Sequence, residues 1–329
     1  MISTHPEDNS VDAVVLAAGK GKRMRPFSNA IAKPMLPLLN KPLLGILAER
    51  LVAAGVGRLV FVVSEDNRAE VKTYFDTQLE RLGVPIAYVV QNPPKGTADA
   101  IYQGGLETTS AHVLSVAGDN LLPEEFFSRI ITEHLAHQPS TRATLTLQQF
   151  PAEELAHLSS VAYHPDGSVD QIVEKPTPEQ VLSEYASLSM YVFQRSVLNY
   201  FGSVKPSPRG ELEAPDAFLD LLAEGQVLRG CINKNFVHIS SPADLWRHNL
   251  AMLVPESNEV DPSASVSDEA RLTLCVVGAN AVIGEGCVLH RCVVLPNTIV
   301  PAQTTLQDSV VGSSPEGRLD VVAVPSEDQ

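Results

Sequence analysis

Cysteine is scarce in this chain of 329 residues, and its four cysteines form no familiar metal-binding or redox pattern. No two of them are arranged as Cys-x-x-Cys, and none has a histidine partner at the spacing of a zinc site. We therefore interpret them as small core side chains of a protein kept in a reducing compartment. They are Cys231, Cys275, Cys287 and Cys292.

Basic residues and long apolar runs are also few. The chain has 24 lysines and arginines against 39 aspartates and glutamates, a net charge of -15 that suits neither nucleic acid nor anionic lipid. No apolar run approaches the ~20 residues of a membrane span. Residues 1–10 are polar and lack the apolar region of a secretion signal, so we expect a flexible tail there. We expect a cytoplasmic protein without a nucleic-acid or membrane partner.

Five of the 24 cations cluster in one stretch, residues 14–37. It opens with the apolar run Val14–Ala18, which predicts a buried strand, and then turns through Gly19 and Gly21. Glycines let the backbone approach a ligand closely, and cations beside such a turn suit a polyphosphate. The cations in and after the turn are Lys20, Lys22, Arg23, Arg25 and Lys33.

Predicted strands and helices alternate over the next hundred residues. Such alternation indicates a parallel sheet with right-handed crossovers, in which ligands bind at the carboxyl ends of the strands. The Gly19 turn, Gln91 and Asp119 all follow predicted strands, so we expect them at one edge of the sheet. The predicted strands are 14–18, 58–63, 86–90 and 113–117, and the predicted helices are 42–54, 67–82 and 98–106.

The middle of the chain is more mixed. We assign residues 11–254 to one α/β domain, Rossmann-like, with a mixed, mainly parallel sheet. Its later predicted strands are 144–150, 169–173, 189–193 and 235–239, and its later predicted helices are 215–224 and 242–253.

A hexapeptide repeat follows residue 255. It predicts a short left-handed parallel β-helix of two to three coils over residues 259–312, with short sandwich strands as the alternative. Residues 313–329 are expected to form a disordered acidic tail. One apolar position recurs every six residues with one residue dropped after Leu272, namely Val260, Val266, Leu272, Val277, Ile283, Leu289 and Leu295. A second inward position follows four residues after each, namely Ala264, Ala270, Val276, Ala281, Cys287, Val293 and Ile299.

Several segments together resemble the sugar-phosphate nucleotidylyltransferases, which include glucose-1-phosphate thymidylyl- and uridylyltransferases. The matching segments occur in the family's order between Leu16 and Asp216, and a hexapeptide tail is a common addition in the family. The resemblance implies the nucleotide-diphospho-sugar transferase fold. The segments are LAAGKGKRM, KPMLPLLNKP, GTADAI, GDN, VEKP and GELEAPD.

The resemblance also implies a reaction. In this family a sugar 1-phosphate oxygen attacks the α-phosphorus of a nucleoside triphosphate, and pyrophosphate leaves. Such chemistry needs positioning and charge neutralisation more than a general base, because the nucleophile is already an anion. The resemblance makes Arg23 and Lys33 catalytic and makes Asp119 a ligand of Mg²⁺, a hard cation that prefers carboxylate oxygen.

Binding roles follow from the same resemblance. Glu174 would bind sugar hydroxyls and Lys175 the sugar phosphate. More ordinary roles compete with these assignments: Arg23 and Lys33 as solvated charges, Asp119 as a helix cap, and Glu174-Lys175 as an exposed turn. The residues implied for nucleotide binding are Leu16, Ala17, Ala18, Gly19, Gly21, Gln91, Gly96 and Thr97.

Gln91 bears on which base is bound. A glutamine amide can donate and accept hydrogen bonds at once, which suits the edge of uracil or thymine. Guanine presents neighbouring donors and would prefer a carboxylate. Provided that Gln91 meets the base, the sequence favours UTP or dTTP.

The chain departs from the family pattern on the side of the sugar. His238 stands where the family usually has an acidic or amide residue that helps to bind metal, and imidazole is a poor Mg²⁺ ligand. Glu213 or Asp216 could compensate. Serine replaces the expected residues in two further places, which would add bulk near the sugar. These serines are Ser159, Ser160 and Ser189.

Two hypotheses remain from the sequence. The first is a Mg²⁺-dependent enzyme that makes a UDP- or dTDP-sugar from a sugar 1-phosphate. The second is a catalytically weakened or regulatory relative that binds nucleotide or nucleotide sugar and assembles through its β-helix, so that we expect a homo-oligomer. Acetyltransferase activity in the β-helix is disfavoured, because the predicted coils are few and His290 is their only histidine.

Overall fold

The computed structural model describes residues 9–156, 158–208, 210–234 and 237–325, and the chain forms two compact units. Unit 1 comprises the residues up to Gly19 together with Leu47–Val237. Unit 2 comprises Lys20–Ile46 together with the residues from His238 onward. This division differs from the predicted boundary between residues 254 and 259, because the cationic stretch and the last helix belong with the C-terminal coils.

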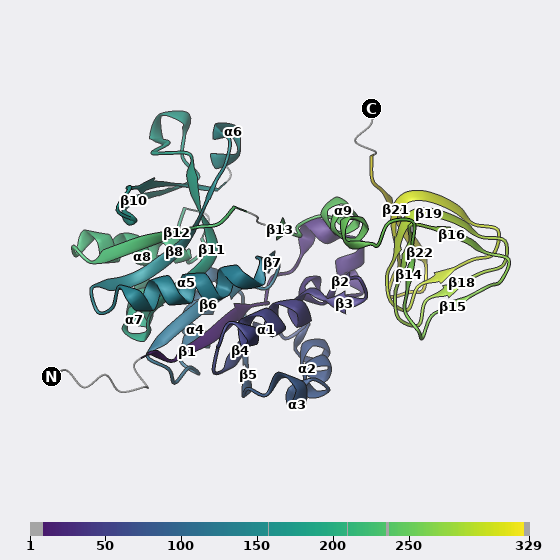
Figure 1. Ribbon diagram of the computed structural model, residues 1–329, viewed down its shortest axis with the longest axis horizontal. Coiled ribbons are helices and arrows are strands. Elements are labelled where there is room, and N and C mark those ends of the chain that lie inside the picture. The colour runs from purple at the N-terminus through teal and green to yellow at the C-terminus, as the bar shows by residue number, and fades with distance from the viewer. Residues whose placement is uncertain (1–8, 157, 209, 235–236, 326–329) are drawn as a thin grey trace. The chain divides into compact units, whose positions relative to one another are not determined.

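Unit 1 is built on a nine-stranded mixed sheet with strand order β5-β4-β1-β6-β11-β8-β12-β10-β9 (Figure 1). Its first four strands are parallel to one another, as the alternation of strands and helices predicts. β11 then runs antiparallel to both β6 and β8. The strands are β1 (Val11–Leu16), β4 (Leu59–Val63), β5 (Ile86–Val90), β6 (His112–Ala117), β8 (Thr141–Gln149), β9 (Ser159–Tyr163), β10 (Ser168–Glu174), β11 (Tyr185–Gln194) and β12 (Val227–Ile232).

Helices cover both faces of this sheet. On one face α4 (Thr97–Gly105), α7 (Leu198–Ser203) and α8 (Ala214–Ala223) enclose an aliphatic and aromatic core. Gly104 of α4 has no room for a side chain, because an added Cβ would lie 2.5 Å from Val14. This close approach seats α4 directly on β1.

The opposite face carries α5 (Glu124–Ala136), which packs against β8, β11 and β12. The predicted helix 67–82 is divided into α2 (Arg68–Asp76) and α3 (Leu79–Leu82). Between them, the Thr77 hydroxyl donates to the Tyr74 carbonyl at 2.6 Å, which caps the end of α2. Two further helices of this part of the chain are α1 (Leu43–Ala53) and the short α6 (Ala152–Leu155). None of the helices in the described ranges is long and apolar enough to cross a membrane.

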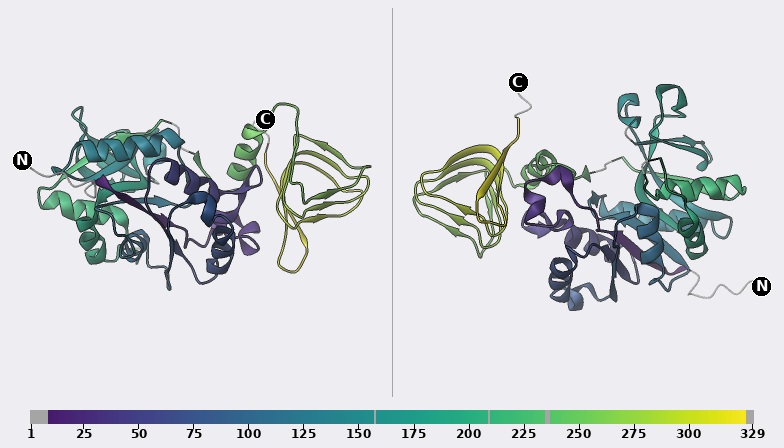
Figure 2. Two further views of the ribbon diagram at one scale, coloured as in Figure 1. Left: turned by 60° about the horizontal axis from the view of Figure 1, so that its bottom comes forward. Right: turned by 180° about the vertical axis from the view of Figure 1, so that it is seen from behind.

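The C-terminal strands of unit 2 stack into parallel coils (Figures 1 and 2). In every parallel ladder the paired residues are 17 apart along the chain, as in Val277 beside Val260 and Val294 beside Val277. The strands are β14 (Glu259–Val260), β15 (Ser265–Val266), β16 (Arg271–Thr273), β17 (Val276–Val277), β18 (Val282–Ile283), β19 (Val288–Val294), β20 (Ile299–Val300) and β21 (Thr305–Ser313).

The coil length corrects part of the predicted repeat. The sequence pattern drops one residue once, whereas the structure drops one in every coil at the same corner. Val294 rather than Leu295 therefore lies above Val277, and Val300 rather than Ile299 faces the core, leaving Ile299 62% exposed. For the same reason Cys275 and Cys292 pack in the interior cluster of the coils, whereas Val276 and Val293, although buried, lie outside that cluster.

The shortened corner has a repeated backbone conformation. Leu274, Arg291 and Asp308 follow one another at intervals of one coil, and all three have left-handed φ angles, of 54°, 53° and 44°. Left-handed residues also recur at the other corners, at Asn280 and Asn297 and at Gly286 and Gln303, so this conformation turns the chain at each corner and does not by itself account for the dropped residue. The Arg291 Nε atom lies 3.0 Å from the Asp308 carboxylate, which joins two successive coils at this corner.

Helix α9 (Pro242–Met252) packs on the coils beside this corner. The Trp246 indole N–H donates to the Arg291 carbonyl at 2.7 Å, and the Arg291 guanidinium lies 4.9 Å from the centre of the Trp246 ring. At its other side α9 holds the hairpin of β2 (Pro37–Leu38) and β3 (Lys41–Pro42) through the fully buried Asn249. This helix therefore joins the coils to the segment that follows Lys33.

The end of the chain is more ordered than the sequence predicts. β22 (Leu319–Ala323) pairs antiparallel with β21. The expected disordered tail from residue 313 therefore forms a hairpin on the last coil, while residues 326–329 lie outside the described residues. All four cysteines are buried and unpaired, which confirms their interpretation as core side chains.

A buried histidine pair leads to a prediction about stability. His134 of α5 is fully buried, with Nε2 3.1 Å from His112 Nδ1 and Nδ1 3.0 Å from the Thr144 hydroxyl. Burial lowers the pKa of His134 from 6.5 to about 3, so the folded protein leaves it neutral where the unfolded chain takes up a proton. Acidification from pH 6.5 towards about 3 should then cost up to about 1.4 kcal/mol of unfolding free energy per pH unit.

Urea unfolding across this pH range measures the effect. The variant His134→Gln keeps a side chain that can form hydrogen bonds but cannot titrate, so its unfolding free energy should fall less steeply on acidification. The same pH slope in both proteins would contradict the assignment.

Candidate functional site

The carboxyl end of β1 is fixed by hydrogen bonds from both neighbouring segments. The Ala17 amide donates to the Val62 carbonyl of β4 at 2.8 Å, and the Gly118 amide donates to the Leu16 carbonyl at 2.9 Å. Asp119, half-buried between β6 and β7 (Asn120–Leu121), is therefore next to the residue that pairs with the end of β1. This edge brings the start of the glycine turn and Asp119 together.

Asn67, which carries no functional motif, supports the same turn. Its buried side-chain amide donates to the Ala17 carbonyl at 2.8 Å and its Oδ1 accepts from the Ser64 amide at 2.9 Å. Truncation would leave the Ala17 carbonyl buried without this partner, which is costly. The sequence offers little signal for this role, since Asn67 precedes α2 as an ordinary capping residue would.

Gln91 follows β5 and is buried, at 5% exposure. Its backbone amide donates to the Val63 carbonyl, and its side-chain Nε2 donates to the Gly96 carbonyl at 3.0 Å and to the Asp99 carboxylate at 2.7 Å. Two acceptors engage the two protons of the amide nitrogen, so Oε1 is the atom through which this side chain can meet a base. The sequence suggests that the Gln91 amide both donates to the base and accepts from it. In the structure its nitrogen already donates to protein groups, so its oxygen is left to accept a hydrogen bond from a base.

Gly96 and Thr97 are held against the segment that starts α8. Gly96 has φ 127° and ψ 178°, and an added Cβ would lie 2.3 Å from the Leu212 carbonyl oxygen. The Thr97 hydroxyl accepts from the Ala214 amide at 2.9 Å. The GTADAI and GELEAPD segments are therefore one structural assembly, and Thr97 ties α4 to α8.

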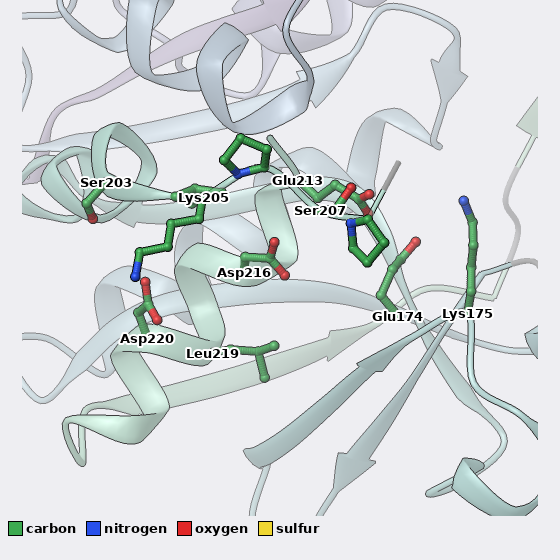
Figure 3. A pocket seen from close by; sticks show the side chains of 12 residues that line it. Glu174, Lys175, Ser203, Lys205, Ser207, Glu213, Asp216, Leu219 and Asp220 are labelled. Atoms are coloured by element: carbon green, nitrogen blue, oxygen red, sulfur yellow. The ribbon is translucent and has the colours of Figure 1, made fainter. Parts of the chain in front are cut away.

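A cavity of about 650 Å³ lies beside this assembly (Figure 3). Glu174, at the end of β10, points into it, together with Glu213 and Asp216 from the start of α8. Lys205 reaches towards Asp220 in the same cavity. The described residues lining it are Glu174, Lys175, Ser203, Val204, Lys205, Pro206, Ser207, Pro208, Glu213, Asp216, Leu219 and Asp220.

The turn after β10 has an unusual backbone. Lys175 has a left-handed φ of 50°, and its amide donates to the Leu158 carbonyl at 2.7 Å. The fully buried Tyr191 lies near Glu174, and burial, followed by the charge of Glu174, raises the pKa of its phenol. Tyr191 therefore lies close enough to Glu174 for the charge of the carboxylate to act on its phenol.

The serines expected to obstruct a sugar have other partners. The buried Ser160 hydroxyl donates to the Ser183 carbonyl and accepts from the Leu182 amide at 2.9 Å. The buried Ser159 hydroxyl accepts from the Ser187 amide, also at 2.9 Å. Neither serine is among the described residues lining the cavity. Ser189 is exposed on β11.

The predicted cations lie in unit 2. Gly21 has φ 56° and packs on Lys33, since an added Cβ would lie 2.8 Å from Lys33 Cβ. Arg23 is exposed on the short helix η2 (Lys22–Met24), and Lys33 begins η4 (Lys33–Met35). His238 ends β13 (Val237–His238), and the start of the predicted strand 235–239 lies outside the described residues.

The residues available to hold a metal ion are carboxylates at two places in unit 1, Asp119 after β6 and the group at the start of α8. Across the ranges that the structure describes, no three His, Cys, Asp or Glu side chains cluster as a ready-made metal site. Mg²⁺ is commonly held by one or two carboxylates with waters and substrate phosphates, so a single half-buried Asp119 fits it. Glu213 and Asp216 instead line the cavity with Glu174.

Comparison with known proteins defines the class. The family model described as nucleotidyl transferase matches residues 12–253, and the chain belongs to this family of enzymes. The family resemblance of the sequence motifs is thereby confirmed.

The individual relatives share less than a third of their aligned residues with this chain. The chain is 28% identical over 258 residues to the low-salt glycan biosynthesis nucleotidyltransferase Agl11 of Haloferax volcanii, covering 78% of this chain and 70% of that protein. It is 24% identical to a glucose-1-phosphate thymidylyltransferase of Neisseria meningitidis, covering 73% and 81%. A solved UDP-glucose pyrophosphorylase complexed with UDP-glucose has the same fold, with TM-score 0.65 at 19% identity over 74% of this chain and 98% of that one.

The Gly96 contact predicts a large effect of a small substitution. Gly96→Ala adds backbone strain of about 1–3 kcal/mol and a clash with the Leu212 backbone, so it should destabilise unit 1 markedly. Gly83→Ala is the matched control, because Gly83 also has a positive φ but faces open space. Urea unfolding should show a larger loss for Gly96→Ala, and equal losses would contradict the contact.

Proposed function

We propose that this enzyme transfers a nucleotidyl group from UTP or dTTP to a sugar 1-phosphate, which gives a nucleotide sugar and pyrophosphate. The observation that carries the proposal is the hydrogen-bonded edge at which Leu16 and Gly118 meet, because it sets Asp119 beside the start of the glycine turn. Relatives named glucose-1-phosphate thymidylyltransferase and UTP–glucose-1-phosphate uridylyltransferase support the same class of substrates.

The chain's residues supply positioning and charge. In the proposal, the backbone of Leu16 to Gly19 and the turn at Gly21 bind the triphosphate, and Gly96 and Thr97 shape the nucleotide side. Arg23 and Lys33 neutralise charge on the phosphates as the bond to pyrophosphate breaks. No general base is required, because the attacking phosphate oxygen is already anionic. We expect the main catalytic contribution to be alignment of the two phosphates.

Asp119 is the proposed ligand for Mg²⁺. A divalent cation bound there would offset the charge of the triphosphate oxygens. Asp119 is half-buried directly after β6, where the hydrogen bond from the Gly118 amide to the Leu16 carbonyl fixes the neighbouring backbone. His238 is not needed as a ligand in this scheme.

The cavity at Glu174 is the proposed sugar 1-phosphate site. Its volume of about 650 Å³ is ample for a phosphorylated monosaccharide. Glu174 would accept hydrogen bonds from sugar hydroxyls, and Lys175 would pair with the phosphate. Glu213 and Asp216 offer further acceptors on the α8 side.

A weakened or regulatory nucleotide-binding relative is the second proposal. It rests on His238 at a position where the family usually has a metal-binding residue. The serine replacements at Ser159 and Ser160 no longer support it, since both hydroxyls are used within the fold.

A pyrophosphate-release assay tests the leading proposal. UTP, dTTP, GTP, ATP and CTP are each paired with glucose, N-acetylglucosamine and mannose 1-phosphates in Mg²⁺. We expect turnover with a pyrimidine triphosphate and a loss of about 100-fold or more for Asp119→Asn, in line with the loss of one key electrostatic group. Nucleotide binding without turnover for any pair would favour the second proposal over the first.

The contacts of Gln91 predict the outcome of a base-selection variant. Gln91→Glu would place a carboxylate against the Gly96 carbonyl and the Asp99 carboxylate, so the like charges would repel. The variant should bind every triphosphate more weakly and should not gain preference for GTP. Calorimetry with UTP, dTTP and GTP measures this, with Gln91→Asn as the uncharged control, and a switch to GTP would contradict the geometry.

A further inference from the structure

The cationic loop, residues 20–33, rests on the C-terminal coils. Phe27, in the short helix η3 (Phe27–Asn29), is 3% exposed, and Leu295 is 1% exposed. Gly312 of β21 lies one coil after Leu295, and an added Cβ there would lie 2.8 Å from Phe27 Cδ1 and 3.2 Å from Leu295 Cδ1. We call Phe27, Leu295 and Gly312 the loop seat. Glycine within a strand marks a close approach, and here the approaching group is the Phe27 ring.

The rest of the loop covers the coils incompletely. A cavity of about 180 Å³ lies beside the seat, lined by Phe27, Ala30 and Ile31 from the loop and by residues such as Asn297 and Ser313 from the coils. A void contributes no packing contacts, whereas the Phe27 ring packs closely on Gly312 beside it.

Short hydrogen-bonded turns connect the seat to the cations. The Ala30 and Ile31 amides both donate to the Phe27 carbonyl at 3.1 Å, and η4 starts two residues later at Lys33. At the other end, Gly21 packs on the stem of Lys33. The loop is therefore closed at its base by Gly21 and Lys33, and a displacement of Phe27 would be passed to both ends.

The segment after Lys33 is held by a second contact. The Asn249 side chain of α9 accepts from the Leu39 amide at 2.9 Å and donates to the Pro37 carbonyl at 3.1 Å. With Phe27 on the coils and Leu39 on α9, both flanks of Lys33 are anchored on C-terminal elements.

We propose that the β-helix positions the cationic loop for the nucleoside triphosphate, with Phe27 and Gly312 as positioning residues. The inference rests on the proposed function, in which Arg23 and Lys33 meet the phosphates. It predicts that adding a single methyl group in the β-helix lowers kcat/KM for the triphosphate but leaves the binding of the sugar 1-phosphate unchanged.

Gly312→Ala is the decisive variant. The added methyl group pushes Phe27 from its seat, and a displacement of ~1 Å at a positioned group can cost up to about 100-fold in rate. We expect kcat/KM for the triphosphate to fall by about tenfold, with the KM for the sugar 1-phosphate within about twofold of wild type. Phe27→Leu in the same chain should restore most of the loss, because a smaller side chain makes room for the methyl group.

Ser265→Thr is the matched control, since it adds one methyl group at an exposed outward position of β15. It should leave both kinetic constants unchanged. Unchanged triphosphate kinetics in Gly312→Ala would overturn the inference. So would a rise in the KM for the sugar 1-phosphate as large as the rise for the triphosphate, together with a lower unfolding midpoint. If Gly312→Ala does not fold, the single variant Phe27→Leu takes its place. For the inference to stand, it must lower kcat/KM for the triphosphate and leave the KM for the sugar 1-phosphate unchanged.

Calorimetry separates this inference from the proposed function. If wild type turns over no substrate pair, the proposed function fails, and binding of dTTP and UTP in Mg²⁺ decides the positioning role. Weaker binding by Gly312→Ala than by Ser265→Thr supports it. Equal binding by the two variants, or no binding by wild type, overturns it.

Discussion

The alignment of three strand ends is the constraint on which unit 1 depends. β1 pairs in parallel with both β4 and β6, so its last residues are held by the Val62 carbonyl on one side and the Gly118 amide on the other. This pairing ends the strand at a fixed point and releases the chain into the glycine turn. Asn67 and the close packing of Gly104 on Val14 then keep that point rigid.

The fold was largely predictable because its signals are local. The apolar runs of β1, β4, β5 and β6 alternate with amphipathic helices, and each strand end carries a recognisable group such as Gln91 or Asp119. β9 and β12 were not predicted, since Ser159-Ser160 and Arg229-Gly230 interrupt their apolar pattern. Their hydroxyl and backbone partners come from distant segments, which no local pattern reveals.

The motifs name candidate site residues, but they do not reveal the hydrogen-bond partners of those residues. The donors and acceptors of Gln91 and Thr97 depend on Gly96, Asp99 and Ala214. Tertiary contacts thereby decide which atoms remain available to a ligand.

The division of the chain into two units could not be predicted from the sequence, because Asn249 and Phe27 join segments more than two hundred residues apart.

The 17-residue coil limits how this protein can change in evolution. Since the ladders pair residues 17 apart from the first coil to the last, each coil is in register with the next only at that spacing. An insertion or deletion within the ladders keeps the interior aligned only if it adds or removes a whole coil. Any other length would turn inward side chains such as Ile283 towards solvent, so the β-helix can lengthen or shorten only in steps of one coil.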